Sequence, residues 1–172
     1  MTMKTGLITL RPLKKEDYHP IQDLMNTFKD AKLFNQSSLF FQKDIFFHYV
    51  NEPEQPESYH TILDANTEGF VGLIGLVQST HDTEAELVIV IKPEYQGLGY
   101  ADEAMRQIMA YAFETLNLAS INIVTEIINQ KAIDLFRRFN AVKTEQCDEA
   151  CQCYIITKDN YQQVKHKSEV KP

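Results

Sequence analysis

The fold of this chain is decided by residues 84–116, which read EAELVIVI-KPEYQGLGY-ADEAMRQIMAYAFETL. The apolar run Leu87–Ile91 predicts a buried strand, and after a proline two glycines lead into an amphipathic helix whose apolar side chains recur from Ala101 to Leu116. Glycines let a backbone approach a ligand closely, and the first amides of a helix carry its positive dipole end, so the turn could hold a pyrophosphate. Spacing alone does not distinguish such a site from a plain connection.

The remaining sequence predicts an α/β fold around one mixed, mostly antiparallel sheet flanked by helices. Strands are expected at residues 7–10, 59–63, 69–77, 120–126, 141–145 and 152–157. Helices are expected from Asp17, as N-cap, to Phe28, from about Ser38 to Val50, and after Asn129 through Phe139. The tail, residues 158–172, is polar and is expected to fray.

Composition limits the partners of the protein. At 172 residues the chain fits one domain, and 17 Lys and Arg against 24 Asp and Glu give a net charge of −7. This balance argues against nucleic acid as a partner and favours a cationic ligand. No apolar run is long enough for a membrane span, and the first residues lack the apolar core of a secretion signal, so a cytoplasmic location and no membrane partner are expected.

Cysteines and histidines give no metal-binding pattern. The three cysteines, Cys147, Cys151 and Cys153, lie close together near the C-terminal end but lack a Cys-x-x-Cys knuckle and a fourth ligand. Because their number is odd, we expect reduced thiols in a strand pair. The five histidines are scattered, and no metal is expected.

The order of residues in the glycine turn is more specific than its spacing. Gln96-x-x-Gly99-x-Ala101, after a hydrophobic strand and a proline, resembles the acetyl-coenzyme A (acetyl-CoA) signature of the GNAT acetyltransferase superfamily. The resemblance extends through Ala85-Glu86-Leu87, Tyr111-Ala112-Phe113, Asn129-x-Lys131-Ala132 and Leu135-Phe136, and is greatest to the spermidine N-acetyltransferase and ribosomal-protein acetyltransferase branch. It implies a single GNAT domain over residues 1–157, acetyl-CoA as cosubstrate, and leaves a homodimer open.

Acyl transfer to an amine requires removal of a proton, because an alkylamine with a pKa near 10.4 is protonated at neutral pH. Glu86, in an otherwise apolar strand, is the candidate base, although it could equally be a rim carboxylate that attracts a cation or a solvated strand end. Asn129 could cap its helix, bind the pantetheine arm of the cosubstrate, or do both. By resemblance, the cosubstrate-binding residues are Ile89, Val90, Ile91, Gln96, Gly97, Leu98, Gly99, Tyr100, Ala101, Asn129 and Phe136.

Phe136 departs from the resembling branch. Polyamine-acetylating relatives commonly have at this position a tyrosine that protonates the departing thiolate, and phenylalanine has no proton to give. Tyr95, Tyr100 or Tyr154 could substitute, or the thiolate could leave unaided. Two further departures, Asn140-Ala141 in place of Gly-Phe and the lack of an acidic aromatic stretch between Ala31 and Phe47, put a polyamine acceptor in doubt.

The sequence therefore predicts an N-acetyltransferase that moves an acetyl group from acetyl-CoA to a primary amine, either on a small amine, which could be polyamine-like, or on a protein N-terminus. The alternative is a non-catalytic acyl-CoA binding or sensing module. A dinucleotide oxidoreductase is the weakest interpretation, because Asp102 stands where Gly-x-Gly-x-x-Gly needs its last glycine.

Overall fold

The computed structural model describes residues 2–28, 42–52, 57–78, 83–147 and 149–170. In these residues eight strands form one mixed sheet in the order β1-β2-β3-β4-β5-β6-β8-β7, which confirms the predicted α/β class. The β5–β6 pair is parallel, whereas β1–β2, β2–β3, β6–β8 and β7–β8 are antiparallel. The chain divides into two compact units, Met1–Leu76 with Val88–Gln107 and Val77–Leu87 with Ile108–Pro172, and each is described by itself.

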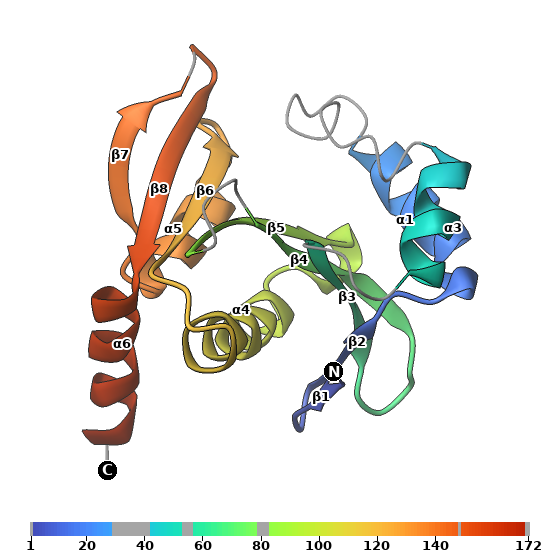
Figure 1. The fold of residues 1–172 in the computed structure, drawn as a ribbon, viewed down its shortest axis with the longest axis horizontal. Helices are drawn as coiled ribbons and strands as arrows, with labels where there is room; N and C mark the ends of the chain where they lie inside the picture. The colour runs from blue at the N-terminus through green and yellow to red at the C-terminus, as the bar shows by residue number, and fades with distance from the viewer. Residues whose placement is uncertain (1, 29–41, 53–56, 79–82, 148, 171–172) are drawn as a thin grey trace. The chain divides into compact units, whose positions relative to one another are not determined.

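The first unit combines the N-terminal strands with two helices and the start of α4. Its elements are β1 (Met3–Lys4), β2 (Ile8–Pro12), η1 (Lys15–Asp17), α1 (Tyr18–Thr27), α3 (Lys43–Asn51), β3 (Glu57–Asp64), most of β4 (Phe70–Gln78), the end of β5 (Glu84–Ile91), η3 (Pro93–Tyr95) and most of α4 (Tyr100–Ala110). Helices α1 and α3 lie side by side (Figure 1), joined by an aromatic contact of 5.4 Å between the ring centroids of Tyr18 and Phe46. The first part of the expected second helix, before Gln42, lies outside the described residues.

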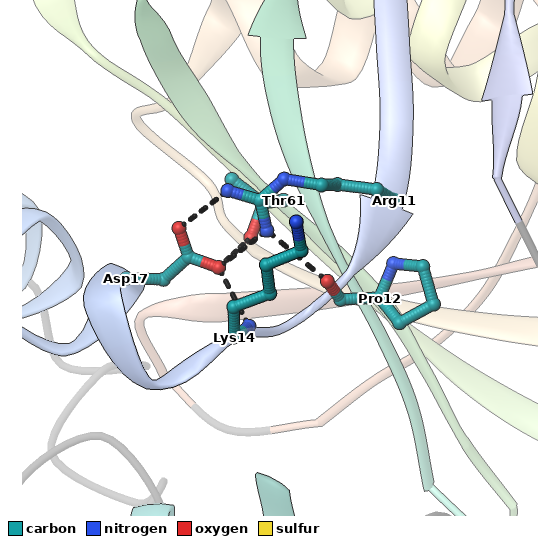
Figure 2. A network of polar contacts seen from close by, with 5 residues as sticks. All are labelled: Arg11, Pro12, Lys14, Asp17 and Thr61. Carbon is teal, nitrogen blue, oxygen red and sulfur yellow. Dashed lines mark hydrogen bonds and ion pairs between the residues drawn. The ribbon is translucent and has the colours of Figure 1, made fainter.

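Asp17 does not cap α1 as predicted. It occupies the N-cap position, but its side chain makes no capping hydrogen bond to α1. Its carboxylate instead accepts hydrogen bonds from Arg11, from the Lys14 backbone amide at 2.8 Å and from the Thr61 hydroxyl at 2.9 Å (Figure 2). A buried carboxylate gains more from a guanidinium and a hydroxyl than from one amide, so tertiary partners override the local capping preference.

Two glycines of β4 allow close packing inside the first unit. A Cβ on Gly72 would lie 2.1 Å from the carbonyl oxygen of Val90, and one on Gly75 would lie 2.4 Å from the ring of Tyr59. Any side chain at either position would therefore clash with backbone or with a buried ring. Gly72 and Gly75 are therefore strand positions at which other elements pack directly against the backbone.

The second unit is built on the parallel pairing of β5 with β6. Its elements are the end of β4, the start of β5, the last three residues of α4, η4 (Tyr111–Thr115), β6 (Ser120–Glu126), α5 (Gln130–Arg138), β7 (Val142–Gln146), β8 (Cys151–Thr157) and α6 (Lys158–Val170). Strands β6 and β8 lie side by side (Figure 1). Ala85 pairs with Ile121 in β6, which in turn pairs with Ile156 in β8. All three side chains are buried and contribute to the core of this unit.

The helix predicted through Leu116 changes its geometry near its end. α-Helical structure stops at Ala110, and a π-helical turn continues from Tyr111 to Thr115. Leu116 donates its amide to the Tyr111 carbonyl at 2.9 Å, and Asn117 follows with a left-handed φ of 56°. The wider turn and the left-handed residue together end the helix.

Two expectations about the C-terminal region are wrong. The tail forms helix α6 instead of fraying, and Tyr161 stacks on Phe113 with 5.1 Å between ring centroids, which gives this polar helix a packing contact. Cys147 and Cys153 form a disulfide across the β7–β8 hairpin, with their Cα atoms 5.8 Å apart, whereas Cys151 is buried outside it. An odd number of cysteines means only that not all three can form disulfides. The register of the β7–β8 hairpin decides which two cysteines lie close enough to bond.

Candidate functional site

The turn between β5 and α4 has left-handed backbone at both of its glycines. Gly97 has a φ of 74° and Gly99 a φ of 91°, angles that other L residues rarely adopt. A Cβ on Gly97 would meet none of the described atoms within 4 Å, and one on Gly99 would lie 3.7 Å from Leu7 Cδ2, an ordinary contact. Backbone conformation, not crowding, therefore requires the glycines, and the space beside Gly97 can admit a ligand.

Gln96 closes the turn onto the end of β5. Its side-chain Nε2 donates to the carbonyl oxygen of Ile91 at 3.1 Å. On the β4 side, the Lys92 amide donates to the Val71 carbonyl at 2.9 Å. These two hydrogen bonds fix the end of β5, where the turn begins. The Gln96 side chain therefore helps to hold the backbone of the turn in place.

The amides that open α4 follow directly after Gly99. The carbonyl of Gly99 accepts the first helical hydrogen bond, from the Glu103 amide at 3.1 Å. The preceding amides have no acceptor within the helix, so they carry the positive end of its dipole. Leu98 is 61% exposed on the same turn. The arrangement suits a diphosphate, because backbone donors and a helix N-terminus follow two glycines.

Tyr100 connects the turn to the β3–β4 hairpin, a link that the sequence did not predict. Its hydroxyl donates a hydrogen bond to Asp64 Oδ2, and both side chains are buried. This hydrogen bond, with those from the backbone of Thr67 and Asn66, lowers the pKa of Asp64 to about 2 and raises the pKa of Tyr100. An aspartate followed by Asn66 and Thr67 is a signal for a side-chain turn, but no local pattern indicates a partner 36 residues away.

The tyrosines considered as proton donors have other contacts. The Tyr100 hydroxyl proton is already donated in a hydrogen bond to Asp64. Tyr95 packs edge-on against Tyr100 with 5.2 Å between ring centroids. Tyr154 is 4% exposed and pairs in register with Ile123 of β6.

Glu86 lies in the second unit, on the first half of β5. Its backbone pairs with Asn122 of β6, and its side chain is exposed between the buried Ala85 and Leu87. Water therefore reaches the carboxylate, yet neighbouring protein atoms displace part of its hydration and raise its pKa. A raised pKa suits a group that must accept a proton near neutral pH.

Helix α5, in the second unit, carries two of the predicted residues. Asn129 is its N-cap, and Phe136 lies within it. Asn129 Oδ1 accepts from the Ala132 amide at 3.2 Å, which confirms the predicted N-cap, and the residue is exposed. Phe136 is 3% exposed and belongs to the apolar face with Ile133 and Phe139. The ring of Phe136 therefore acts in packing.

The predicted site residues belong to both compact units. Ile89, Val90 and Ile91 lead into the turn formed by Gln96, Gly97, Leu98, Gly99, Tyr100 and Ala101 in the first unit. Glu86, Asn129 and Phe136 belong to the second. Among the described residues no cluster of His, Cys, Asp or Glu could hold a metal ion. Within the same residues, no helix combines the length and apolarity needed to cross a membrane.

A mixed α/β sheet in which a strand passes through a glycine turn into a helix is typical of proteins that bind a phosphate-containing ligand at that turn. Comparison with known proteins specifies the class. The sequence model described as the acetyltransferase (GNAT) domain matches residues 8–142, and the chain belongs to this family. It is an acetyl-CoA-dependent N-acetyltransferase, with acetyl-CoA as its cosubstrate.

Two curated relatives of the chain are both named spermidine N(1)-acetyltransferase. The spermidine N(1)-acetyltransferase of Escherichia coli strain K12 is 29% identical over 132 residues, which cover 76% of this chain and 70% of the relative. The spermidine N(1)-acetyltransferase of Vibrio cholerae is 28% identical over 147 residues, which cover 79% of each chain.

Solved structures share the fold. The Vibrio cholerae spermidine N-acetyltransferase in complex with CoA and spermine has a TM-score of 0.78 at 23% identity, covering 92% of this chain and 99% of that one. Apo FdhC, a nucleotide-linked sugar GNAT, has a TM-score of 0.81 at 20% identity, covering 98% and 97%. Because proteins named for such different acceptors share the fold equally well, the fold does not identify the acceptor.

Proposed function

We propose that the acceptor is a polyamine, acetylated at a primary amine. The observation that carries this proposal is the match, over about three quarters of the chain, to two curated spermidine N(1)-acetyltransferases. The net charge of −7 supports it, because an acidic protein attracts a polycation. Phe136 and the other departures in the sequence argue against it, so the acceptor requires a direct test.

The glycine turn is proposed to bind the diphosphate of acetyl-CoA. The open space at Gly97 and the amides at the start of α4 support this role. The residues that take part are Gln96, Gly97, Leu98, Gly99, Tyr100 and Ala101, of which Gln96 and Tyr100 act through the shape of the turn. The backbone of Ile89, Val90 and Ile91 would hold the pantetheine arm, and an amide of this segment would stabilise the oxyanion on the thioester carbonyl. Asn129 would also contact pantetheine beside its capping role.

Glu86 is proposed to accept the proton of the attacking amine, directly or through water. Its raised pKa and solvent exposure support this role. The amine nitrogen forms a bond to the acetyl carbon, the carbon–sulfur bond breaks, and the electron pair leaves with sulfur. The departing thiol has a pKa near 8.5, so the thiolate can leave and take a proton from water, which fits the burial of Phe136 and the hydrogen bond of Tyr100.

The acceptor is tested by measuring thiol release from acetyl-CoA with spermidine, spermine, amino acids, aminoglycosides and peptides with free N-termini. We expect turnover with spermidine or spermine at the highest kcat/KM. Preference for a peptide or an aminoglycoside would overturn the polyamine assignment. If calorimetry shows CoA binding while no polyamine in the panel is acetylated, the polyamine assignment fails and the acceptor belongs to another class of amine.

We also propose that residues 1–157 form the acetyltransferase domain, that 158–172 are an appendage to it, and that the chain self-associates. A related Vibrio cholerae spermidine N-acetyltransferase has been solved as a dodecamer. Light scattering of the full chain and of one ending at residue 157 tests both points. A full chain that stays monomeric would contradict self-association, and loss of folding in the shorter chain would contradict the domain limit.

A further inference from the structure

We propose that Asp64 is a positioning residue for acetyl-CoA, acting through Tyr100 to hold the glycine turn in its ligand-binding conformation. This inference rests on the proposed cosubstrate role of the turn. Asp64 itself belongs to the β3–β4 hairpin and lies outside the turn.

The two oxygens of Asp64 serve different elements. Oδ1 accepts from the backbone amides of Asn66 and Thr67, at 2.9 and 2.8 Å, and from the Thr67 hydroxyl at 3.2 Å. Oδ2 accepts from the Tyr100 hydroxyl. The carboxylate is thus fixed to its own hairpin by one oxygen and presents the other to the first residue of α4.

The backbone of Asp64 is fixed as well. Its amide donates to the Gly69 carbonyl at 2.9 Å, and the residue pairs in register with Ile8 of β2. Asp64 is therefore a rigid reference point in the sheet, because its main chain and both carboxylate oxygens have partners.

Tyr100 is placed where it can control the turn. It follows Gly99, whose φ is 91°, and it begins α4. Tyr100 is 8% exposed, and its ring lies edge-on to that of Tyr95, which precedes the turn. With Gln96 bonded to the Ile91 carbonyl, the turn is held at both ends, at Gln96 and at Tyr100.

Such restraint matters because glycines lose more conformational freedom on ordering than other residues. A turn with two left-handed glycines would otherwise lose this freedom when the ligand binds, and preorganisation removes that cost from the binding free energy. The charge of Asp64 is not the useful property, since a carboxylate would repel a diphosphate. Four donated hydrogen bonds spread that charge, so the role of Asp64 is geometric.

Tyr100→Phe tests the proposal, because it removes the hydroxyl and keeps the ring. We expect the Kd for CoA by calorimetry and the KM for acetyl-CoA to rise about tenfold, the effect of losing one charge-assisted hydrogen bond. The kcat and the KM for the amine should stay within about twofold of wild type, since the acceptor chemistry is untouched. Asp64→Asn keeps an oxygen for the hairpin amides and offers the tyrosine an amide, so it should give a smaller rise.

Thr61→Val is the matched control. It lies on the same strand as Asp64 and removes one hydrogen bond donated to another buried carboxylate, that of Asp17. We expect a similar loss of thermal stability with the Kd for CoA unchanged. An equal rise in Kd in Thr61→Val would show that general destabilisation, not positioning, is responsible.

The outcomes separate this inference from the proposed function. If wild type binds CoA and folded Tyr100→Phe binds it equally well, the positioning role is overturned and the proposed function stands. If Tyr100→Phe does not fold, Asp64→Asn decides, and unchanged CoA affinity there overturns the role. If wild type fails to bind CoA, the proposed function itself fails. If it binds CoA but acetylates no polyamine, only the acceptor assignment is lost.

Discussion

Arg11 donates two hydrogen bonds from its guanidinium to the Asp17 carboxylate, from Nη1 to Oδ2 at 2.7 Å and from Nη2 to Oδ1 at 2.9 Å (Figure 2). The Asp17 side chain is 5% exposed and that of Arg11 14%, so the pair is largely removed from water. Burial alone would raise the pKa of Asp17, but the hydrogen bonds from Arg11, Lys14 and Thr61 outweigh it and the pKa is lowered.

Removing only the cation should be costly. Arg11→Met leaves the Asp17 carboxylate buried without its partner, so we expect unfolding in urea to show a loss of about 3 kcal/mol. The double variant Arg11→Met with Asp17→Leu removes both charges and should recover part of that loss. If the loss of unfolding free energy in the double variant equals the sum of the losses in Arg11→Met and Asp17→Leu measured separately, the two side chains act independently and the prediction is wrong.

Acid should destabilise the protein over a defined range. The pKa of Asp64 is lowered from 3.8 to about 2, and that of Asp17 is also lowered, so the folded state binds these protons less readily than the unfolded state. Their stabilisation is complete above the unfolded value and disappears as pH falls through the folded one. We expect Tm to fall between about pH 5 and about pH 2. Asp64→Asn should show a shallower fall, and an identical pH profile would contradict the assignment.

Glu86 should determine how kcat/KM rises with pH on the acidic side, or acidic limb, of the pH–rate profile. Its pKa is raised by partial loss of hydration, so kcat/KM should rise with pH through a value above that of an ordinary glutamate. Glu86→Gln should lower kcat by about a hundredfold and remove this limb. Calorimetry should show CoA binding retained in the variant. A limb that persists in Glu86→Gln would assign the base to another group.

The left-handed angle at Gly99 makes this position sensitive to any side chain. Gly99→Val places a branched Cβ at a φ of 91°, and relief of about 1–3 kcal/mol of strain would reshape the turn. We expect the KM for acetyl-CoA to rise about tenfold or more. Gly6→Ala is the control, since its Cβ would meet no described atom within 4 Å and its φ is not left-handed. Unchanged CoA affinity in folded Gly99→Val would argue against a diphosphate at this turn.

Asn129 allows its two proposed roles to be separated. Asn129→Ala removes the cap of α5 and should cost about 1 kcal/mol of stability. Asn129→Ser restores a capping oxygen but not the amide, so it should recover stability. If Asn129 also binds pantetheine, the KM for acetyl-CoA stays raised in Asn129→Ser. A serine variant normal in both respects would reduce Asn129 to a cap.

The sequence by itself determined the elements that local pattern specifies. The apolar run and two glycines predicted β5, the turn and α4, and the structure confirms these elements, with strand β6 and the Asn129 cap in their expected places. Periodicity and glycine chemistry act within a few residues, so one sequence suffices to recognise them. The order of residues in the turn also pointed to the GNAT family, to which the chain belongs.

Only the tertiary structure decided which distant groups meet. Asp17 had the position of a helix cap but bonds to Arg11 and Thr61, Tyr100 had the chemistry of a proton donor but bonds to Asp64, and Cys147 pairs with Cys153. A buried polar group takes its partner from whichever elements the sheet brings beside it, and strand order and register are not encoded in the local pattern. The turn could therefore be read from the sequence, whereas its anchor in the β3–β4 hairpin could not.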